Sequence, residues 1–320
     1  MKQRIITAII MGSILIPVIV IPALKPILEI IVLLLLICAC FEILNMFDKE
    51  HKIKLWIKIL ATVSTCLLYF AMVDSYQVIF PGVKDSIICR FLGHFPYELN
   101  LYMVAIVVFI ATMFFGIVIK DFEIDDIARI FLMMIYLSLC FSSFTILRSY
   151  GVRLIVYLLL ITAFTDIFAL VFGMKFGKHK MAPTISPKKT WEGAIGGTVV
   201  ATIVGLVFLF CYQFISPYFH NGHAIEFFEG VFANTYVYSG KFHIKLFMIL
   251  LTILMSVCGQ LGDLVASKLK RKYGIKDYSN LFPGHGGVMD RFDSCLFASA
   301  TFIAMIQVIA VVFPFLEQVA

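Results

Sequence analysis

Residues 267–293 hold the densest group of chemically active side chains in this sequence. They read SKLKRKYGIKDYSNLFPGHGGVMDRFD and lie between two long apolar runs. Cations neutralise phosphates, carboxylates supply oxygen ligands for a divalent metal, and glycines let the backbone approach a ligand closely. This combination predicts a site for phosphates and a divalent cation. Its candidate residues are Ser267, Lys270, Arg271, Lys276, Asp277, His285, Asp290, Arg291 and Asp293.

A solvated basic loop that only fixes orientation in a membrane is the alternative interpretation. It accounts for the lysines, but not for the carboxylates of residues 290–293 or for the glycines around His285. Carboxylates at the end of an apolar segment are costly, so a site is favoured. Just upstream, Asp263 and Ser267 are four residues apart, and on a helix they share one face.

A second polar region covers residues 175–197 and reads KFGKHKMAPTISPKKTWEGAIGG. Pro183 and Pro187 predict an extended backbone over residues 181–188. Thr190 or Lys189 then leads into a helix whose first N–H groups are free to bind phosphate. Taken alone, a phosphate site and an orientation loop are equally good interpretations. The candidate ligands here are Ser186, Lys188, Lys189, Thr190 and, at the helix N-terminus, Glu192.

Asp166 lies inside the apolar run around residues 153–173, with no other charge within several residues of it. An ionised Asp within a membrane span costs about 2.5–3.5 kcal/mol, so it is expected to face the helix bundle and have a partner. We include it among the substrate-binding candidates. His179 is a weaker candidate, since a lone loop histidine is more often only solvated.

The elements that must position these residues are membrane helices. The chain has 320 residues, of which 61% are hydrophobic and 14% charged, and its mean hydropathy of +0.99 excludes a soluble globular protein. The prediction is an all-α polytopic integral membrane protein with a cytoplasm-facing polar site. Runs of about 20 apolar residues predict nine transmembrane helices. They lie near 5–24, 26–46, 54–73, 101–119, 129–148, 153–173, 193–215, 246–267 and 294–316.

The first run is too long for a signal peptide and is interpreted as a retained helix. Residues 1–150 are interpreted as scaffold helices, and Glu29 and Glu42 within them as charges at the interface or facing the bundle. Residues 151–320 form the predicted catalytic region, with basic loops at 175–192 and 268–293.

The distribution of Lys and Arg predicts the orientation. With the N-terminus inside, 18 of these residues lie in inner segments and 7 in outer ones, which places both basic loops in the cytoplasm. The expected location is the cell (inner) membrane. The net charge of +6 is concentrated in a few loops, which favours anionic ligands at the bilayer and excludes nucleic acid as the expected partner. The eight cysteines lie mostly singly in apolar runs and indicate no function.

At these residues the sequence resembles a known family. The pattern of residues 267–293 resembles the signature of phosphatidate cytidylyltransferases, which are also called CDP-diacylglycerol synthases. The segment SPKKTWEG at residues 186–193 looks like the second hallmark of that family. The motifs cover roughly the C-terminal half, and the first 150 residues match only as hydrophobic helices. The signature residues are Ser267, Leu269, Lys270, Arg271, Lys276, Asp277, Ser279, Phe282, Pro283, His285, Gly286, Gly287, Val288, Asp290, Arg291, Phe292 and Asp293.

The resemblance implies transfer of CMP from CTP to phosphatidate, with release of pyrophosphate and a requirement for Mg²⁺. It also implies a homodimer with its site near the leaflet surface. The metal-binding aspartates of the family fall on Asp263 and Asp290. A second cation that bridges the attacking and leaving oxygens is compatible with this chemistry.

Phosphoryl transfer between two polyanions requires positioning and charge neutralisation. Ser267 is suited to ligate a metal or a phosphate, and His285 to bind a phosphate or shuttle a proton. Asp277 and Asp293 are expected to orient basic groups. The cations expected to hold the CTP and lipid phosphates are Lys270, Arg271, Lys276 and Arg291, with Lys188 and Lys189 serving the pyrophosphate.

Three alternatives stay open from the residues alone. An isoprenoid-alcohol kinase or an ether-lipid cytidylyltransferase would also combine CTP with a lipid. A transporter would place Asp166 and Asp263 inside the bundle, although it would be expected to show repeats and a broken helix. A catalytically dead scaffold is disfavoured by the intact signature.

Overall fold

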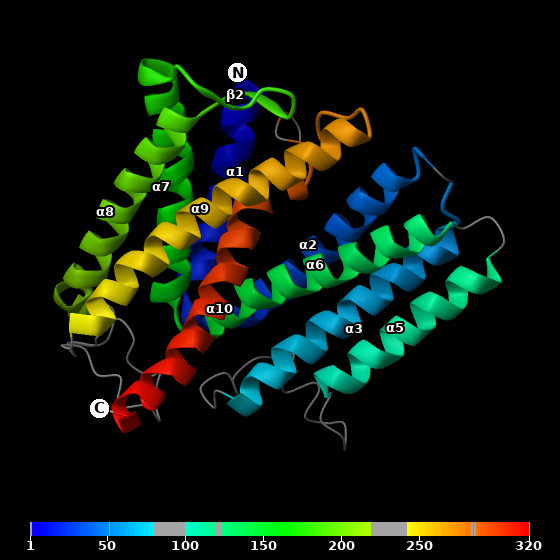
Figure 1. Cartoon of the computed structure of the whole chain (residues 1–320), viewed down its shortest axis with the longest axis horizontal. Coiled ribbons are helices and arrows are strands. Elements are labelled where there is room, and N and C mark those ends of the chain that lie inside the picture. Colours follow the sequence, from blue (N-terminus) through cyan, green and yellow to red (C-terminus); the bar gives the residue numbers. More distant parts are fainter. Residues whose placement is uncertain are drawn as a thin grey trace. The chain divides into compact units, whose positions relative to one another are not determined.

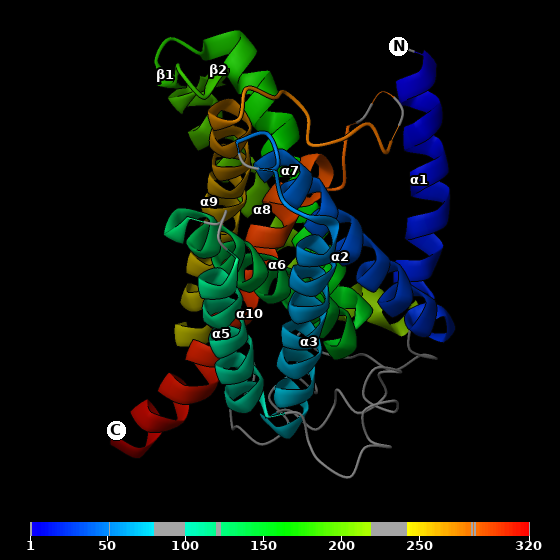
Figure 2. The same cartoon turned by 90° about the vertical axis from the view of Figure 1, so that its right-hand side faces the viewer.

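The computed structural model describes residues 2–50, 52–79, 100–119, 123–218, 242–282, 284 and 286–319. The described residues are almost entirely helical (Figure 1 and Figure 2). The chain divides into two compact units, each made of two stretches of sequence. The first unit is Met1–Ser149 with Leu269–Phe292, and the second is Tyr150–Lys268 with Asp293–Ala320. The predicted loop therefore belongs largely to the unit that contains the N-terminal helices.

Long apolar helices make up most of the first unit. Tyr69 of α3 and Thr145 of α6 share a buried hydrogen bond of 2.9 Å between their hydroxyl groups. Phe109 of α5 packs edge-on against Phe131 of α6. The helices are α1 (Lys2–Val20), α2 (Lys25–Phe47), α3 (Leu55–Ile79), α5 (Leu101–Val118) and α6 (Ile124–Tyr150), with a 3₁₀ turn, η1, at Pro22–Leu24.

The charged end of α6 fastens the segment that follows α9. Arg129 pairs with Glu50 and, at 2.7 Å, with Asp126. It also donates a hydrogen bond of 2.9 Å to the hydroxyl of Tyr273. Tyr273 is buried and packs its ring against Phe47 at the end of α2. The beginning of the predicted loop is thus held by the N-terminal helices.

The second unit combines helices with one small β-hairpin. Its elements are α7 (Val152–Phe176), β1 (Lys180–Ala182), β2 (Ser186–Thr190), α8 (Trp191–Ile215), the 3₁₀ turn η3 (Ser216–Tyr218), most of α9 (Phe242–Lys272) and most of α10 (Met289–Val319). Helices α7 and α8 approach closely because α8 has glycines at the contact. A Cβ on Gly193 would lie 2.6 Å from the Ala169 carbonyl oxygen, and one on Gly197 would lie 2.6 Å from that of Thr165. Small residues at such contacts are typical of membrane helices.

Hydroxyl and amide groups connect α7, α8 and α9. Thr165 and Ser256 share a 2.8 Å hydrogen bond, and the Ser256 hydroxyl donates to Thr198 at 3.0 Å. Gln260 donates to the same Thr198 hydroxyl at 2.9 Å. These polar groups satisfy one another between apolar helices, so the three helices are fixed in rotation about their axes.

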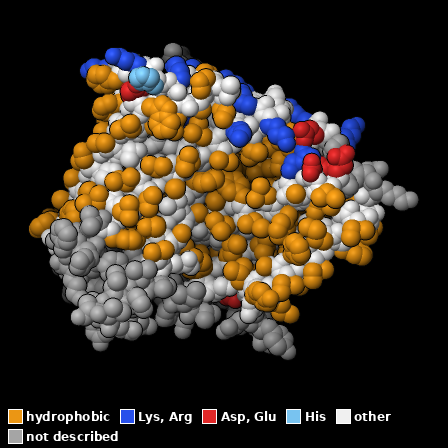
Figure 3. All heavy atoms as spheres, in the orientation of Figure 1, with side chains coloured by type: hydrophobic (Ala, Val, Ile, Leu, Met, Phe, Trp, Pro, Cys, Tyr) orange, Lys and Arg blue, Asp and Glu red, His pale blue; other side chains and the backbone are white. Residues whose placement is uncertain are grey.

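The predicted helices are found in part. Each of the nine predicted runs overlaps a helix of the described chain, but only seven helices are long and apolar enough to span a membrane over the residues whose side chains are described. They are α2, α3, α5, α6, α7, α8 and α9. The polytopic all-α class is confirmed apart from the hairpin, whereas the number nine is not. Figure 3 shows hydrophobic side chains spread widely over the described part of one face.

Two boundaries of the predicted loop 268–293 are wrong. Helix α9 continues to Lys272, since lysine and arginine are favourable at a helix C-terminus. Helix α10 begins at Met289, with Asp290 in its first turn, where a carboxylate is favourable. Asp290, Arg291 and Asp293 therefore lie on a helix.

Candidate functional site

The β-hairpin positions the cations of the second unit. Strands β1 and β2 pair antiparallel, with Lys180 opposite Thr190 and Ala182 opposite Ser186. The extended backbone expected over residues 181–188 is confirmed only in part, because residues 183–185 form a turn between the strands. The second strand ends where α8 begins. Thr190 is the N-cap of α8, and its hydroxyl accepts the N–H of Gly193 at 3.2 Å.

Glu192, in the first turn of α8, contacts the other end of the hairpin. Its carboxylate accepts the backbone N–H groups of Lys178 and His179, each at 3.2 Å. It also lies 2.6 Å from Nδ1 of the His179 ring. Glu192 thus contacts the backbone before β1 and the His179 ring, and its predicted substrate contact stays a prediction. His179, expected to be only solvated, has a carboxylate partner.

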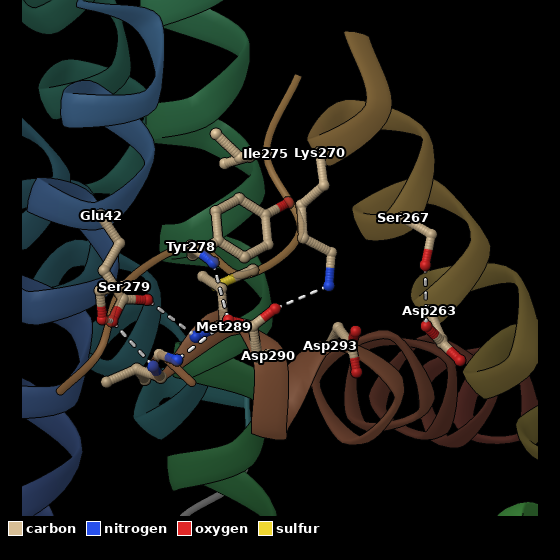
Figure 4. A network of polar contacts seen from close by, with 12 residues as sticks. Glu42, Asp263, Ser267, Lys270, Ile275, Tyr278, Ser279, Met289, Asp290 and Asp293 are labelled. Atoms are coloured by element: carbon tan, nitrogen blue, oxygen red, sulfur yellow. Dashed lines mark hydrogen bonds and ion pairs between the residues drawn. The ribbon is translucent and has the colours of Figure 1, made fainter. Parts of the chain in front are cut away.

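Asp263 of α9 is the centre of the polar cluster in the second unit. Its Oδ2 lies 2.6 Å from the ammonium of Lys189, and its Oδ1 accepts a 3.2 Å hydrogen bond from Ser267 (Figure 4). The shared helix face predicted for Asp263 and Ser267 is confirmed. The Lys189 and Asp263 side chains are 28% and 32% exposed, so a ligand can reach both. Lys188, the preceding residue on β2, is exposed.

Asp166 of α7 belongs to the same cluster. The hydroxyl of Ser294 donates to its Oδ2 at 3.4 Å, and it interacts electrostatically with Asp263 and Lys189. The predicted partner is thus present. Asp166 is exposed among these polar groups. Sequence reasoning missed Ser294, which follows directly after the recognised motif.

A glycine brings α9 and α10 together beside these residues. A Cβ on Gly262 would lie 2.7 Å from the carbonyl oxygen of Asp293. Asp293 is buried, and its Oδ1 accepts the N–H of Ser294 at 2.8 Å. This contact lies within the backbone of α10, and the expected role of Asp293 in orienting basic groups stays a prediction.

Asp290 is the centre of a separate cluster in the first unit. Its Oδ1 lies 2.6 Å from the ammonium of Lys270. Its Oδ2 accepts the N–H groups of Tyr278 and Gly287 at 2.8 and 2.9 Å. The Lys270 ammonium also lies 5.3 Å from the centre of the Tyr278 ring, which is a favourable cation–π contact. Figure 4 shows these groups converging on a carboxylate that is only 3% exposed.

The backbone before Asp290 makes a tight turn. Phe282 and Gly286 exchange two backbone hydrogen bonds of 2.9 and 3.1 Å. Gly286 has a φ of +86°, a conformation that favours glycine. The predicted role of His285 lies outside the described residues. Other predicted ligands around the turn are exposed, namely Arg271, Lys276, Asp277 and Arg291.

Glu42 of α2 is the residue that sequence reasoning missed most clearly. Its Oε1 accepts the Ser279 hydroxyl at 2.6 Å and the Val288 N–H at 2.8 Å. Its Oε2 accepts the Met289 N–H at 3.0 Å. The only signal in the sequence is a charge inside an apolar run. Its partners, more than 230 residues later, could not be predicted from it.

The two predicted metal ligands differ in how well they suit a cation. Within the described residues, no three His, Cys, Asp or Glu side chains are arranged to hold a metal. Asp263 is open, and one of its oxygens already receives a cation, the Lys189 ammonium, so its chemistry fits Mg²⁺. The Asp290 carboxylate is buried and already accepts hydrogen bonds from the Lys270 ammonium and from the backbone N–H groups of Tyr278 and Gly287. It fits a metal only through Oδ1 and only when Lys270 moves away.

Comparison with known proteins identifies the family. A model of the Cytidylyltransferase family matches residues 2–309. The phosphatidate cytidylyltransferase of Bacillus subtilis (strain 168) is 31% identical over 301 residues, 93% of this chain and 94% of that protein. That of Staphylococcus haemolyticus (strain JCSC1435) is 38% identical over 176 residues, 55% of this chain and 57% of that protein. The full-length match shows that this chain belongs to the cytidylyltransferase family.

Proposed function

We propose that this protein transfers CMP from CTP to phosphatidate, forming CDP-diacylglycerol and releasing pyrophosphate. The observation that carries the proposal is the match along nearly the whole chain to a relative named phosphatidate cytidylyltransferase. The site chemistry agrees, since reachable ammonium groups and carboxylates at the ends of membrane helices suit two phosphate-bearing substrates.

The reaction needs charge neutralisation more than a base. An oxygen of the lipid phosphate attacks the α-phosphorus of CTP, and the bond to the β-phosphate breaks, with its electron pair leaving on pyrophosphate. The attacking oxygen is already ionised near neutral pH, so no strong base is required. Both substrates are anionic and repel each other. The cations of each unit therefore contribute by lowering that repulsion and by holding the phosphates in position.

Lys189 has a specific part in this proposal. Its ammonium is 2.6 Å from Asp263, and Lys189 lies on strand β2, which leads directly into the N-terminus of α8. A phosphate placed there meets this ammonium but not the free N–H groups expected from the sequence, because the N–H groups of Trp191 and Gly193 already donate to the His179 carbonyl and the Thr190 hydroxyl. Exposed Lys188 adds a second charge next to it. We assign this pair to CTP and its pyrophosphate.

Asp263 and Asp290 are the residues proposed to hold magnesium, with a second cation as a possible addition. Bound Mg²⁺ supplies Lewis-acid stabilisation of the phosphate charge. The openness of Asp263 supports its part, and the resemblance to the family signature supports both. Ser267, hydrogen-bonded to Asp263, fixes the direction of that carboxylate.

The proposed location is the cell (inner) membrane, with the basic segments in the cytoplasm. The distribution of Lys and Arg and the bacterial relatives support it. Single cysteines at exposed Lys178 and Lys276, in a chain without its native cysteines, should resist impermeant labelling in intact cells. A cysteine at Tyr218 should react. The reverse pattern contradicts this orientation. The homodimer rests on the family resemblance alone.

A lipid-acceptor assay tests the proposed activity. Purified protein in detergent micelles is given labelled CTP, Mg²⁺ and one acceptor at a time: phosphatidate, an ether-lipid analogue or an isoprenoid alcohol. We expect lipid-linked CMP with phosphatidate, and none in the matched control Asp263→Asn. Preferential labelling of the ether lipid, or phosphorylation of the alcohol, would replace the proposal with one of those activities.

A further inference from the structure

We infer that Glu42 is a positioning residue, which holds the 278–289 turn and the start of α10 so that Asp290 has its working orientation. The inference depends on the proposed activity, because Asp290 matters only if this region acts on CTP and lipid. Glu42 lies on α2, among helices that the sequence indicated were only a scaffold. The structure gives it three contacts with the turn, and none of them was predictable from its neighbours in sequence.

The contacts of Glu42 join two ends of the turn. The Ser279 hydroxyl donates to Oε1 at 2.6 Å, and the same hydroxyl accepts the Leu281 N–H at 3.2 Å. At the other end, Val288 and Met289 donate their N–H groups at 2.8 and 3.0 Å (Figure 4). One carboxylate thus closes the loop from Ser279 to the first residue of α10.

The burial of Glu42 explains why its carboxylate needs these hydrogen bonds. Glu42 is buried within a mostly apolar span. A buried carboxylate is costly unless it is hydrogen-bonded. The N–H groups at the start of a helix have no partner within the helix, and its dipole favours a negative charge there. The Val288 and Met289 N–H groups offer this favourable site.

Gly287 leaves the space that Glu42 needs. A Cβ on Gly287 would lie 2.5 Å from Oε1 and 2.7 Å from Oε2 of Glu42. Its φ is not positive, unlike those of Gly284 and Gly286. The backbone at Gly287 therefore accepts alanine without strain, and the Glu42 carboxylate is what excludes a side chain.

Three consecutive N–H groups connect Glu42 to Asp290. Gly287 donates to Asp290, and the next two residues donate to Glu42. The two carboxylates therefore hold the same short backbone segment from different sides. If the Glu42 bonds are lost, this segment can turn, and the Asp290 oxygens change direction with it.

The main test compares Glu42→Gln with Glu29→Gln, a buried carboxylate on the same helix. Glutamine has nearly the same volume, but its amide NH₂ cannot accept the Met289 N–H.

We expect kcat per folded enzyme to fall at least about tenfold in Glu42→Gln, the lower end for lost positioning groups. KM for CTP should change less than threefold. Glu29→Gln should keep the parental kcat. Ser279→Ala removes only one of the three Glu42 hydrogen bonds, so it should lower kcat less than Glu42→Gln does. This variant tests the inference if Glu42→Gln does not fold.

A double-mutant cycle tests the contact itself. Gly287→Ala alone should lower kcat because its methyl group displaces the Glu42 carboxylate. In the Glu42→Ala background the methyl group has room, so Gly287→Ala should cause no further loss. Non-additivity of this kind is expected for residues in contact. Additive losses in kcat overturn the inference.

Other outcomes separate the inference from the proposed function. If the parent makes no lipid-linked CMP from any acceptor, the proposed function fails. If the parent is active and Glu42→Gln only melts at a lower temperature, with kcat per folded enzyme unchanged, Glu42 is merely structural and the inference fails. Equal losses of kcat in Glu42→Gln and Glu29→Gln also overturn it.

Discussion

The two polar clusters of this protein are built in opposite ways. In the second unit, Asp263 is about one-third exposed and pairs with Lys189 on a short hairpin. In the first unit, Asp290 is almost fully buried and accepts three N–H donors. Both aspartates carry the same family expectation, metal binding. The difference indicates that one carboxylate is ready to meet a ligand, whereas the other also maintains the backbone around it.

The sharpest consequence concerns Asp263→Asn. Removal of a charged ligand leaves the two anionic substrates without their counter-charge, so turnover should fall by more than about 10³-fold. Because the side chain is partly exposed, the melting temperature should stay near that of the parent. The measurements are CMP transfer at saturating Mg²⁺ and thermal unfolding in the same detergent. Near-parental turnover contradicts the proposal that Asp263 holds a metal.

Asp290→Asn should differ by losing stability as well as activity. The substitution leaves the buried Lys270 ammonium without its counter-charge, and breaking such a pair costs about 3 kcal/mol or more. Adding Lys270→Met should restore part of the stability, because it removes the stranded charge, but not the turnover. Equal melting temperatures for Asp263→Asn and Asp290→Asn would erase the contrast between the clusters.

The same contrast explains what the sequence could predict. In the second unit the decisive features are local: Pro187 lies in the extended strand β2, Thr190 caps the next helix, and Asp263 and Ser267 are one turn apart. Each follows from backbone rules that act over a few residues. The resemblance to a known family identified Asp290, but not its buried environment.

The first unit depends on contacts between residues far apart in sequence. The Glu42 bonds to Ser279 and Met289 connect residues 237 and 247 positions apart. No periodicity or cap signal specifies such a pairing. The helix boundaries at Lys272 and Met289 were also missed, because polar residues at helix ends resemble loop residues. The seven helices that are long and apolar enough to span a membrane, by contrast, follow directly from apolar length.

Lys188 and Lys189 offer a finer comparison within the exposed cluster. Alanine at either position should raise KM for CTP and lower kcat/KM by about 1–3 kcal/mol, the worth of a charged hydrogen bond. Only Lys189 pairs with Asp263. Lys189→Ala should therefore also lower the Mg²⁺ concentration for half-maximal activity, because no ammonium competes for the carboxylate. A two-substrate kinetic matrix with a Mg²⁺ titration distinguishes the two variants. Identical Mg²⁺ curves contradict a shared role of Lys189 and a cation at Asp263.

The smallest expected effect belongs to Thr190. Its hydroxyl caps α8 by accepting the Gly193 N–H, and loss of such a cap costs about 1 kcal/mol. Thr190→Ala should therefore lower the free energy of unfolding by that amount, while Thr190→Ser, which keeps the hydroxyl, should match the parent. Because Thr190 directly follows Lys189, the alanine variant should also raise KM for CTP slightly, by less than Lys189→Ala does. Denaturant unfolding and CTP titration of the two variants measure both effects. If serine and alanine behave alike, the hydroxyl does not position this cluster, and the hairpin pairing alone determines where Lys189 lies.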